Sequence, residues 1–118
     1  MRAQPNAQAI VVLVTCPRSR HAATLATLLV RKRLAACVNV LPRVQSRFWW
    51  NGKVDRASES LLIIKTSARR FPALIRAVRA HHPYEVPEII ALPIVNGFQP
   101  YLAWVRASLS PEKSDRLV

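Results

Sequence analysis

The sequence predicts an α+β fold of the ferredoxin-like type, with the element order β-α-β-β-α-β followed by an extra C-terminal helix. Three observations lead to this class: a continuous apolar run near the start, two amphipathic helical segments, and a long hairpin centred on Asn51-Gly52. Both helices should pack on one face of a four-stranded antiparallel sheet, because the two crossovers are right-handed. For 118 residues we expect one domain over 1–118, with its core at about 9–109 and polar termini.

The first strand and helix follow from apolar patterning. Ala9–Cys16 is a continuous apolar run rich in β-branched residues, which favours a buried strand that ends at Pro17. Arg18–Arg33 carries apolar residues at helical spacing and predicts a helix with Ser19 as its N-cap. The predicted inner face of this helix consists of Ala22, Leu25, Ala26 and Leu29.

The long hairpin is the most specific local signal. Ala35–Trp50 is extended, and Pro42 marks a bulge or an edge position because proline has no backbone donor. Asn51-Gly52 suits a type I′ turn, in which both central residues need positive φ. The returning strand covers Lys53–Thr66, so the arms are long for a small domain. We expect this ribbon to reach beyond its own sheet and to offer open edges to partner strands.

The second half of the chain repeats the helix–strand pattern. Ala68–His81 predicts a helix with Pro72 in its first turn. Glu88–Val95 predicts the fourth strand, and Pro100 opens a short helix. The second helix has an apolar face of Phe71, Leu74, Ile75 and Val78. The sheet face opposite the helices still needs cover, either from the last helix or from another copy of the chain.

The charge balance and the cysteine content of the sequence indicate which partners and which cellular compartment to expect. The sequence has 18 Lys and Arg against 6 Asp and Glu, a net charge of +12, and no acid before Asp55. Such a surface attracts anions, although a lineage-wide preference for arginine on a solvated face gives the same pattern. Cys16 and Cys37 make no disulfide framework, and their apolar neighbours favour buried thiols in a reducing compartment. No long apolar segment follows the charged start, so we expect a cytoplasmic protein without membrane insertion.

Six segments form a specific pattern that covers almost everything from Ile10 to Leu109. They are VTCP at 14–17, KRLAACVNVLP at 32–42, WWNGKV at 49–54, LLIIKT at 61–66, HHPYEVPEIIALP at 81–93 and YLAWV at 101–105. In these segments the chain resembles the CutA family of divalent-cation tolerance proteins. The resemblance implies a ferredoxin-like homotrimer with hairpins paired between subunits, a response to metal ions with copper binding in some members, and no general catalytic activity. It also implies likeness in fold and assembly to PII-type signalling proteins, which bind nucleotides and small anions between subunits.

Three residues are candidate metal ligands. His81 and His82 supply imidazoles suited to copper or zinc, although adjacent residues diverge on a helix and a helix end before Pro83 explains them equally well. Cys16 would be a soft ligand for Cu(I). The resemblance puts this ligand in doubt, because the metal-linked cysteine of some members lies two positions earlier, at Val14. We interpret Cys37 as core packing.

A second set of residues is a candidate ligand cleft. Lys65 ends an apolar strand and needs a partner, which Glu59 or Glu88 could supply. The set is either a structural network at a subunit interface or an inter-subunit cleft for a small anion or a metal, with Lys65 supplying charge and Tyr84 a hydrogen bond. Its members are Glu59, Lys65, His82, Tyr84 and Glu88, with Trp50 and Trp104 as aromatic walls.

Motifs for other functions are absent from the sequence. It has no nucleophile elbow, P-loop or GxGxxG, so we expect no catalytic activity. The strands LLIIK and AACVNV are aliphatic and cannot stack bases, so we expect no specific nucleic-acid partner, and any such contact would be phosphate-driven. We therefore expect a homotrimer that responds to divalent metal ions. The alternatives are a PII-like sensor of an anionic metabolite and a trimeric protein that anchors other proteins.

Overall fold

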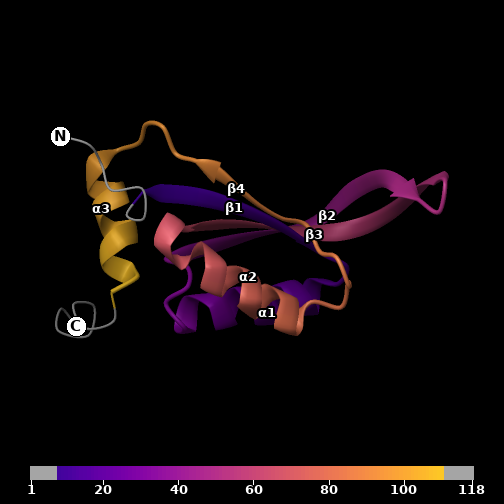
Figure 1. The fold of residues 1–118 in the computed structure, drawn as a ribbon, viewed down its shortest axis with the longest axis horizontal. Coiled ribbons are helices and arrows are strands. Elements are labelled where there is room, and N and C mark those ends of the chain that lie inside the picture. Colours follow the sequence, from indigo (N-terminus) through magenta and orange to yellow (C-terminus); the bar gives the residue numbers. More distant parts are fainter. Residues whose placement is uncertain (1–7, 111–118) are drawn as a thin grey trace.

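The computed structural model describes residues 8–110 and confirms the predicted fold class. The strands form one antiparallel sheet in the order β2-β3-β1-β4. In chain order the elements are β1 (Ala9–Cys16), α1 (Ser19–Arg31), β2 (Cys37–Trp50), β3 (Lys53–Ser67), the 3₁₀ turn η2 (Ala68–Arg70), α2 (Phe71–His81), β4 (Ile89–Pro93) and α3 (Gln99–Ser108). Figure 1 shows α1 and α2 side by side below the sheet and α3 across one end of it.

The main core lies between the sheet and the α1–α2 layer. Alternate residues of β1 and β3 face the helices, and the most deeply buried of them are Val12, Val14, Leu62 and Ile64. The predicted inner face of α1 is confirmed in full, because Ala22, Leu25, Ala26 and Leu29 are all buried. The α2 face is confirmed in part, since Leu74 and Val78 are buried while Phe71 and Ile75 are half-buried.

The predicted helix starts are both shifted. The N-cap of α1 is Arg18, which has extended backbone, and no side chain caps the helix. Ser19 is already helical, whereas a capping hydroxyl must come from the extended residue before the helix, so the prediction of Ser19 as N-cap is wrong. The second α-helix begins at Phe71 rather than Ala68, because residues 68–70 form a tighter 3₁₀ turn. Pro72 lies in the first turn, as predicted.

The hairpin has the predicted turn and the predicted bulge. Asn51 and Gly52 have φ of 51° and 74°, as a type I′ turn requires. The β2–β3 register shifts between Leu41 and Val44, next to Pro42, and Arg43 there has φ of 60°. β1 pairs with β3 as far as Ser60, so the arm beyond that point is a two-stranded ribbon. Figure 1 shows this arm projecting past the rest of the molecule.

The last helix is held in place by two arginines and a small second core. The Arg33 guanidinium donates to the Ser108 carbonyl at 3.0 Å, and the Arg70 guanidinium donates to the Leu109 carbonyl at 2.6 Å. These carbonyls lie at the C-terminal end of α3, where no further helical turn can bond them. Ala36, Val105 and Leu109 pack together beneath the helix.

The sheet face opposite α1 and α2 is only partly covered. The last helix packs at one end, next to Cys37, and leaves the middle of the face accessible to solvent. Ile90 is 49% exposed and Leu92 47% exposed, opposite Leu13 and Val11 of β1. Cys37 is half-buried on this face, so its assignment to the core is wrong. We call the apolar residues Val11, Leu13, Leu41, Leu61, Ile63, Ile90 and Leu92 the open face.

Candidate functional site

Four chemically capable side chains meet where the hairpin arm leaves the sheet. The Tyr84 hydroxyl donates a hydrogen bond to Glu59 Oε2 at 3.2 Å, and the rings of Tyr84 and His82 lie 4.9 Å apart between centroids. Glu59 and His82 are buried, as is Cys16 at the end of β1, which interacts electrostatically with Glu59 and Tyr84. We call Cys16, Glu59, His82 and Tyr84 the Glu59 cluster. The structure thus brings together residues that the sequence placed in two separate candidate sites.

His82 is fully occupied by structural hydrogen bonds. Its Nδ1 accepts a hydrogen bond from the Tyr84 backbone N–H at 3.0 Å, and its Nε2 lies 2.6 Å from the Thr15 carbonyl. A nitrogen that accepts a hydrogen bond carries no proton, so Nε2 carries the ring proton and donates a hydrogen bond to the Thr15 carbonyl. Neither ring nitrogen retains a lone pair for a metal. His82 therefore ties the chain after α2 to the end of β1.

Replacement of His82 by Ala should destabilise the subunit. The change leaves the buried Thr15 carbonyl and the part-buried Tyr84 N–H without their partner. We expect a loss of about 2 kcal/mol in the free energy of unfolding, measured by urea denaturation. His81→Ala is the matched control and should change stability by less than about 0.5 kcal/mol, because His81 is exposed. Equal effects of the two changes would contradict the assigned role.

His81 faces the opposite way from His82. Its Nδ1 lies 2.9 Å from the Ala77 carbonyl and must donate, so Nε2 keeps its lone pair at an exposed position. The two histidines therefore cannot chelate one ion together. Among residues 8–110, no group of three His, Cys, Asp or Glu side chains lies close enough to hold a metal ion. Within this range one chain supplies an imidazole at His81 but not a ligand set.

Cys16 carries a protonated thiol at neutral pH. Burial of the side chain, reinforced by the negative charge of Glu59, raises its pKa from the ordinary value of 9.0 to about 11. Since the thiolate is the metal-binding form, this environment disfavours coordination. Burial also raises the pKa of Tyr84, and the charge and hydrogen bond of Glu59 add to the effect.

The raised pKa of Cys16 predicts a loss of stability in alkali. The folded protein holds this proton up to about pH 11, whereas the unfolded chain releases it near 9.0. The contribution of the thiol is therefore complete below pH 9 and disappears as the pH rises through 11. In Cys16→Ala the decline in the free energy of unfolding over this range should be shallower than in the parent protein. Cys37→Ala is the control, and an unchanged slope in Cys16→Ala would overturn the prediction.

Lys65 has a different partner from the two predicted for it. Its ammonium group donates to Asn39 Oδ1 and to the Ile63 carbonyl, the latter at 3.4 Å. The β2–β3 register pairs Lys65 with Cys37 and places Asn39 diagonally on the same face of the sheet. Within one chain, neither Glu59 nor Glu88 is therefore the partner of Lys65. Asn39 was missed because its proximity depends on strand register, which the sequence does not state.

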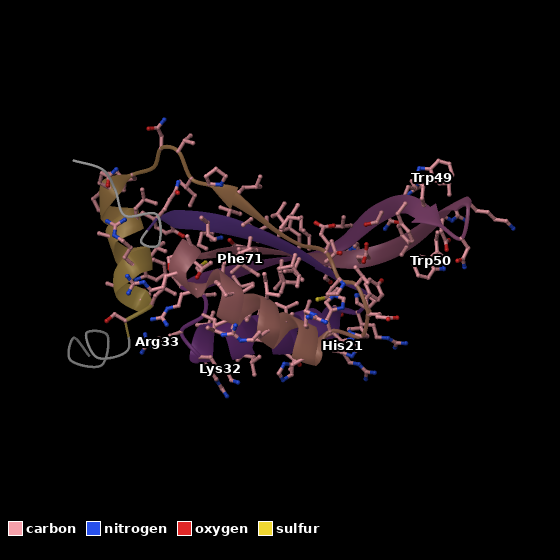
Figure 2. All side chains as sticks on the ribbon, viewed as in Figure 1. His21, Lys32, Arg33, Trp49, Trp50 and Phe71 are labelled. Atoms are coloured by element: carbon pink, nitrogen blue, oxygen red, sulfur yellow. The ribbon has the colours of Figure 1, made fainter. Side chains whose placement is uncertain are left out.

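The residues of the predicted cleft lie in three places within one chain. Trp50 is 63% exposed, and Figure 2 shows it at the tip of the hairpin. Glu59 and Tyr84 lie at the base of the arm, and exposed Glu88 precedes β4 nearby. Lys65 lies toward the α3 end, where Trp104 contacts Tyr101 with ring centroids 5.6 Å apart. Burial raises the pKa of Tyr101, and a hydrogen-bonding Cys37 adds to this effect.

A polar hollow beside the Glu59 cluster was not predicted. It has a volume of about 190 Å³, and Arg43 is the cation in its wall. The signal for it was Pro42, because the bulge beside this proline turns Arg43 into the left-handed region. The hollow is lined by Pro17, Ser19, Pro42, Arg43, Ser58, Glu59 and Ser60.

The topology and the arm define the protein as a ferredoxin-like α+β fold with an overlong central hairpin. The family model of the CutA1 divalent ion tolerance protein matches residues 10–108, and the chain belongs to this family. Human protein CutA is 52% identical over 93 residues, which are 79% of this chain and 52% of that protein. The chain thus spans about half the length of this relative. The divalent-cation tolerance protein CutA of Thermus thermophilus is 50% identical over 96 residues, 81% of this chain and 93% of that protein.

Solved structures of relatives share the fold. The divalent cation tolerance protein of Thermus thermophilus superposes with a TM-score of 0.82 at 49% identity, covering 83% of this chain and 95% of that one. CutA1 from Oryza sativa superposes with a TM-score of 0.85 at 45% identity, covering 89% of this chain and 96% of that one. Within residues 8–110, no helix is long and apolar enough to cross a membrane.

Proposed function

We propose that this CutA-family protein is a non-catalytic, cytoplasmic homotrimer that responds to divalent metal ions by binding them between subunits. Its relatives from Thermus thermophilus and Citrobacter koseri are named divalent-cation tolerance proteins, which supports the ligand class. Other relatives are named chloroplastic or periplasmic, so the compartment varies within the family. The absence of the common catalytic motifs from the sequence supports a binding role.

The hairpin arm is the feature of the structure that best supports assembly into a trimer. Beyond Ser60 its two strands pair with each other, so both outer edges retain unpaired backbone donors and acceptors. The tip exposes large apolar side chains, with Trp49 at 75% and Val54 at 64%. The open face exposes a further apolar area in the centre of the sheet. Copies of the chain that exchange arms would cover both surfaces at once.

The metal site requires more than one chain. His81 offers one imidazole nitrogen, and the part of the chain that the structure describes contains no cluster of three ligand side chains. Copper and zinc ordinarily take several nitrogen, sulfur or oxygen ligands, so neighbouring copies must complete the set. His81 is the residue that we assign to this role in each copy, because its free nitrogen is exposed.

Titration calorimetry of the purified assembly tests this function. We expect saturable binding of Cu(II) or Zn(II) in the parent protein and its loss in His81→Ala. His82→Ala should retain binding at temperatures where it stays folded, because its nitrogens already serve Thr15 and Tyr84. Binding that disappears in His82→Ala and survives in His81→Ala would overturn the assignment, and no heat with either metal would overturn the function.

The hollow beside Arg43 favours a second candidate function, the sensing of a small anionic metabolite. One guanidinium and the serines of its wall are groups that bind phosphate or carboxylate oxygens. In this case a nucleotide panel should give heat that is lost in Arg43→Ala, while metals give none. A trimeric anchoring protein would give no heat with either class of ligand.

A further inference from the structure

The outer surface of the α1–α2 layer is uniformly cationic. Neither helix contains an Asp or a Glu, and no acid occurs from Ser60 to Tyr84. The charges on this surface therefore have no carboxylate neighbours on their own elements. The cations are exposed and are Arg20, Arg31, Lys32, Arg69, Arg76 and Arg79, which we call the basic layer. Figure 2 shows Lys32 extending from α1 away from the sheet.

Helical periodicity aligns the basic layer into two rows. In α1 the residues Arg20, Thr24, Thr27 and Arg31 follow one another at intervals of four, three and four, and all are exposed. They lie opposite the buried stripe of Leu25 and Leu29. In α2, Arg76 and Arg79 lie opposite Leu74 and Val78 in the same way, and Arg69 extends their row. The rows are fixed to rigid helices rather than to loops.

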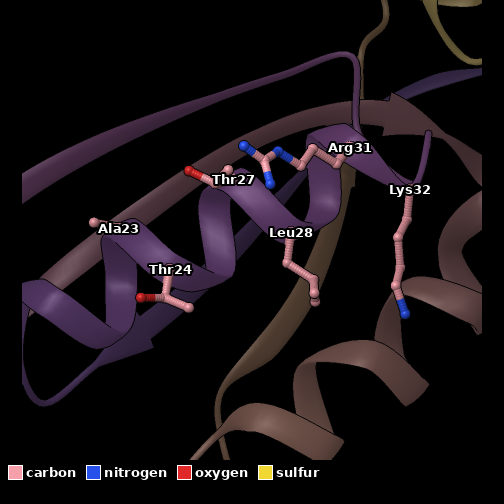
Figure 3. Close-up of a pocket in the computed structure, with 6 residues that line it drawn as sticks. All are labelled: Ala23, Thr24, Thr27, Leu28, Arg31 and Lys32. Atoms are coloured by element: carbon pink, nitrogen blue, oxygen red, sulfur yellow. The ribbon is translucent and has the colours of Figure 1, made fainter.

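A shallow groove runs along the outer surface of α1. It has a volume of about 560 Å³ and is lined by Ala23, Thr24, Thr27, Leu28, Arg31 and Lys32. Figure 3 shows Arg31 extending back along the helix toward Thr27, while Lys32 projects toward α2. Hydroxyl groups next to guanidinium and ammonium groups are the usual partners of phosphate oxygens on nucleic-acid backbones.

From this arrangement we propose that the basic layer binds the phosphate backbone of a nucleic-acid duplex without sequence preference. The helix α1 is about 20 Å long at 1.5 Å per residue, and a duplex segment of this length carries on the order of ten phosphates on its two strands together. The layer lies on the side of the sheet opposite the open face. The basic layer therefore stays accessible when copies of the chain assemble through the open face. Every copy then contributes its own basic layer to binding of the duplex.

The positions of the exposed apolar side chains favour a nucleic-acid duplex over single strands and membranes as the polyanion that the basic layer binds. Proteins that bind single-stranded nucleic acids stack the bases on exposed aromatic rings. In this chain the exposed tryptophans lie on the hairpin and on α3 rather than on α1 or α2. Membrane-surface helices insert large apolar residues beside their cations. Most large apolar residues of α1 and α2 face the sheet; the exceptions on α1 are Val30, at 40% exposure, and the half-buried Leu28 in the groove wall. Backbone phosphates of a duplex match the remaining surface best.

Fluorescence anisotropy with a labelled random-sequence DNA duplex of about three helical turns tests this proposal. The variant Arg31→Gln/Arg76→Gln/Arg79→Gln neutralises three cations of the basic layer. The control Lys53→Gln/Arg56→Gln/Arg106→Gln neutralises three exposed cations on the hairpin and α3. We expect binding by the parent protein to weaken steeply between about 50 and 200 mM salt. The layer variant should bind on the order of 100-fold more weakly, with a salt slope reduced by about 2.7, while the control changes less than about threefold.

Three results would overturn the proposal. The parent protein could fail to bind the duplex at low salt. The two triple variants could lose affinity equally, which would mean that diffuse net charge and not the basic layer drives binding. Vesicles rich in phosphatidylserine could bind more tightly than the duplex and lose that binding in the layer variant. Size-exclusion chromatography of both variants confirms that they keep the oligomeric state of the parent protein.

Discussion

Replacing Ile90 by Asp should convert the proposed trimer into single chains. Ile90 lies on the open face at 49% exposure, so the isolated subunit tolerates a polar side chain there. In the proposed trimer the same position is covered, and an unpaired carboxylate would lose its hydration in every copy. We expect the association constant to fall by at least about 1000-fold, which corresponds to about 4 kcal/mol. Size-exclusion chromatography with light scattering at micromolar concentration measures the change.

Val30→Asp is the matched control for this experiment. Val30 is similarly exposed, at 40%, but lies on α1 on the other side of the sheet. The control should remain assembled and should keep the unfolding temperature of the parent protein within a few degrees. A parent protein that is a stable single subunit at this concentration would refute the proposed trimer. Dissociation of both variants would show that the open face is not the contact.

Removing the two guanidinium groups that hold α3 should be the most destabilising surface change within a subunit. Arg33 and Arg70 come from different elements and bond the carbonyls of Ser108 and Leu109, which have no further helical partners. A hydrogen bond to a charged group contributes about 1.5–3 kcal/mol, so the double change to Ala should lower the free energy of unfolding by about 3 kcal/mol or more. Urea denaturation measures the loss, and the fluorescence of Trp104 in α3 reports local detachment.

Two controls separate the contacts from other effects. Arg69→Ala/Arg79→Ala removes the same charge from exposed positions and should change stability by less than about 1 kcal/mol. Arg33 has φ of 60°, so Arg33→Gly relieves the strain of this left-handed backbone conformation while removing the same side chain. It should be less destabilising than Arg33→Ala. If the Arg33/Arg70 double change matches the exposed pair, the guanidinium contacts do not hold the helix.

Local patterns in the sequence predicted the elements of the fold because their causes are local. The stripe of Leu25 and Leu29 reflects helical periodicity, and the turn at Asn51-Gly52 reflects the backbone freedom of those two residues. Pro42 predicted the bulge because proline cannot donate a ladder hydrogen bond. The start of α1 was misplaced by one residue, since an extended Arg18 can end the loop without any capping side chain.

The candidate site was less predictable because its contacts span the chain. The Tyr84–Glu59 hydrogen bond joins the loop after α2 to β3, and the Lys65–Asn39 bond depends on the β2–β3 register. Both residues of His81-His82 looked like ligands in sequence, yet one points into the protein and the other into solvent. Burial of His82 follows from where α2 ends against β1, which is a matter of packing rather than of spacing.

The position of β1 in the sheet has a consequence for how the chain acquires its structure. β2 and β3 are joined by a two-residue turn, and such hairpins close within microseconds. The central strand, by contrast, pairs with β3 and β4, so that Ala9 meets Ser67 and Ile10 meets Pro93 across most of the chain length. Loop-closure entropy delays contacts of this range. We expect the ribbon to form early and the sheet to close late. Newly made chains therefore expose unpaired strand edges, which can pair with other chains, until β1 pairs with β3 and β4.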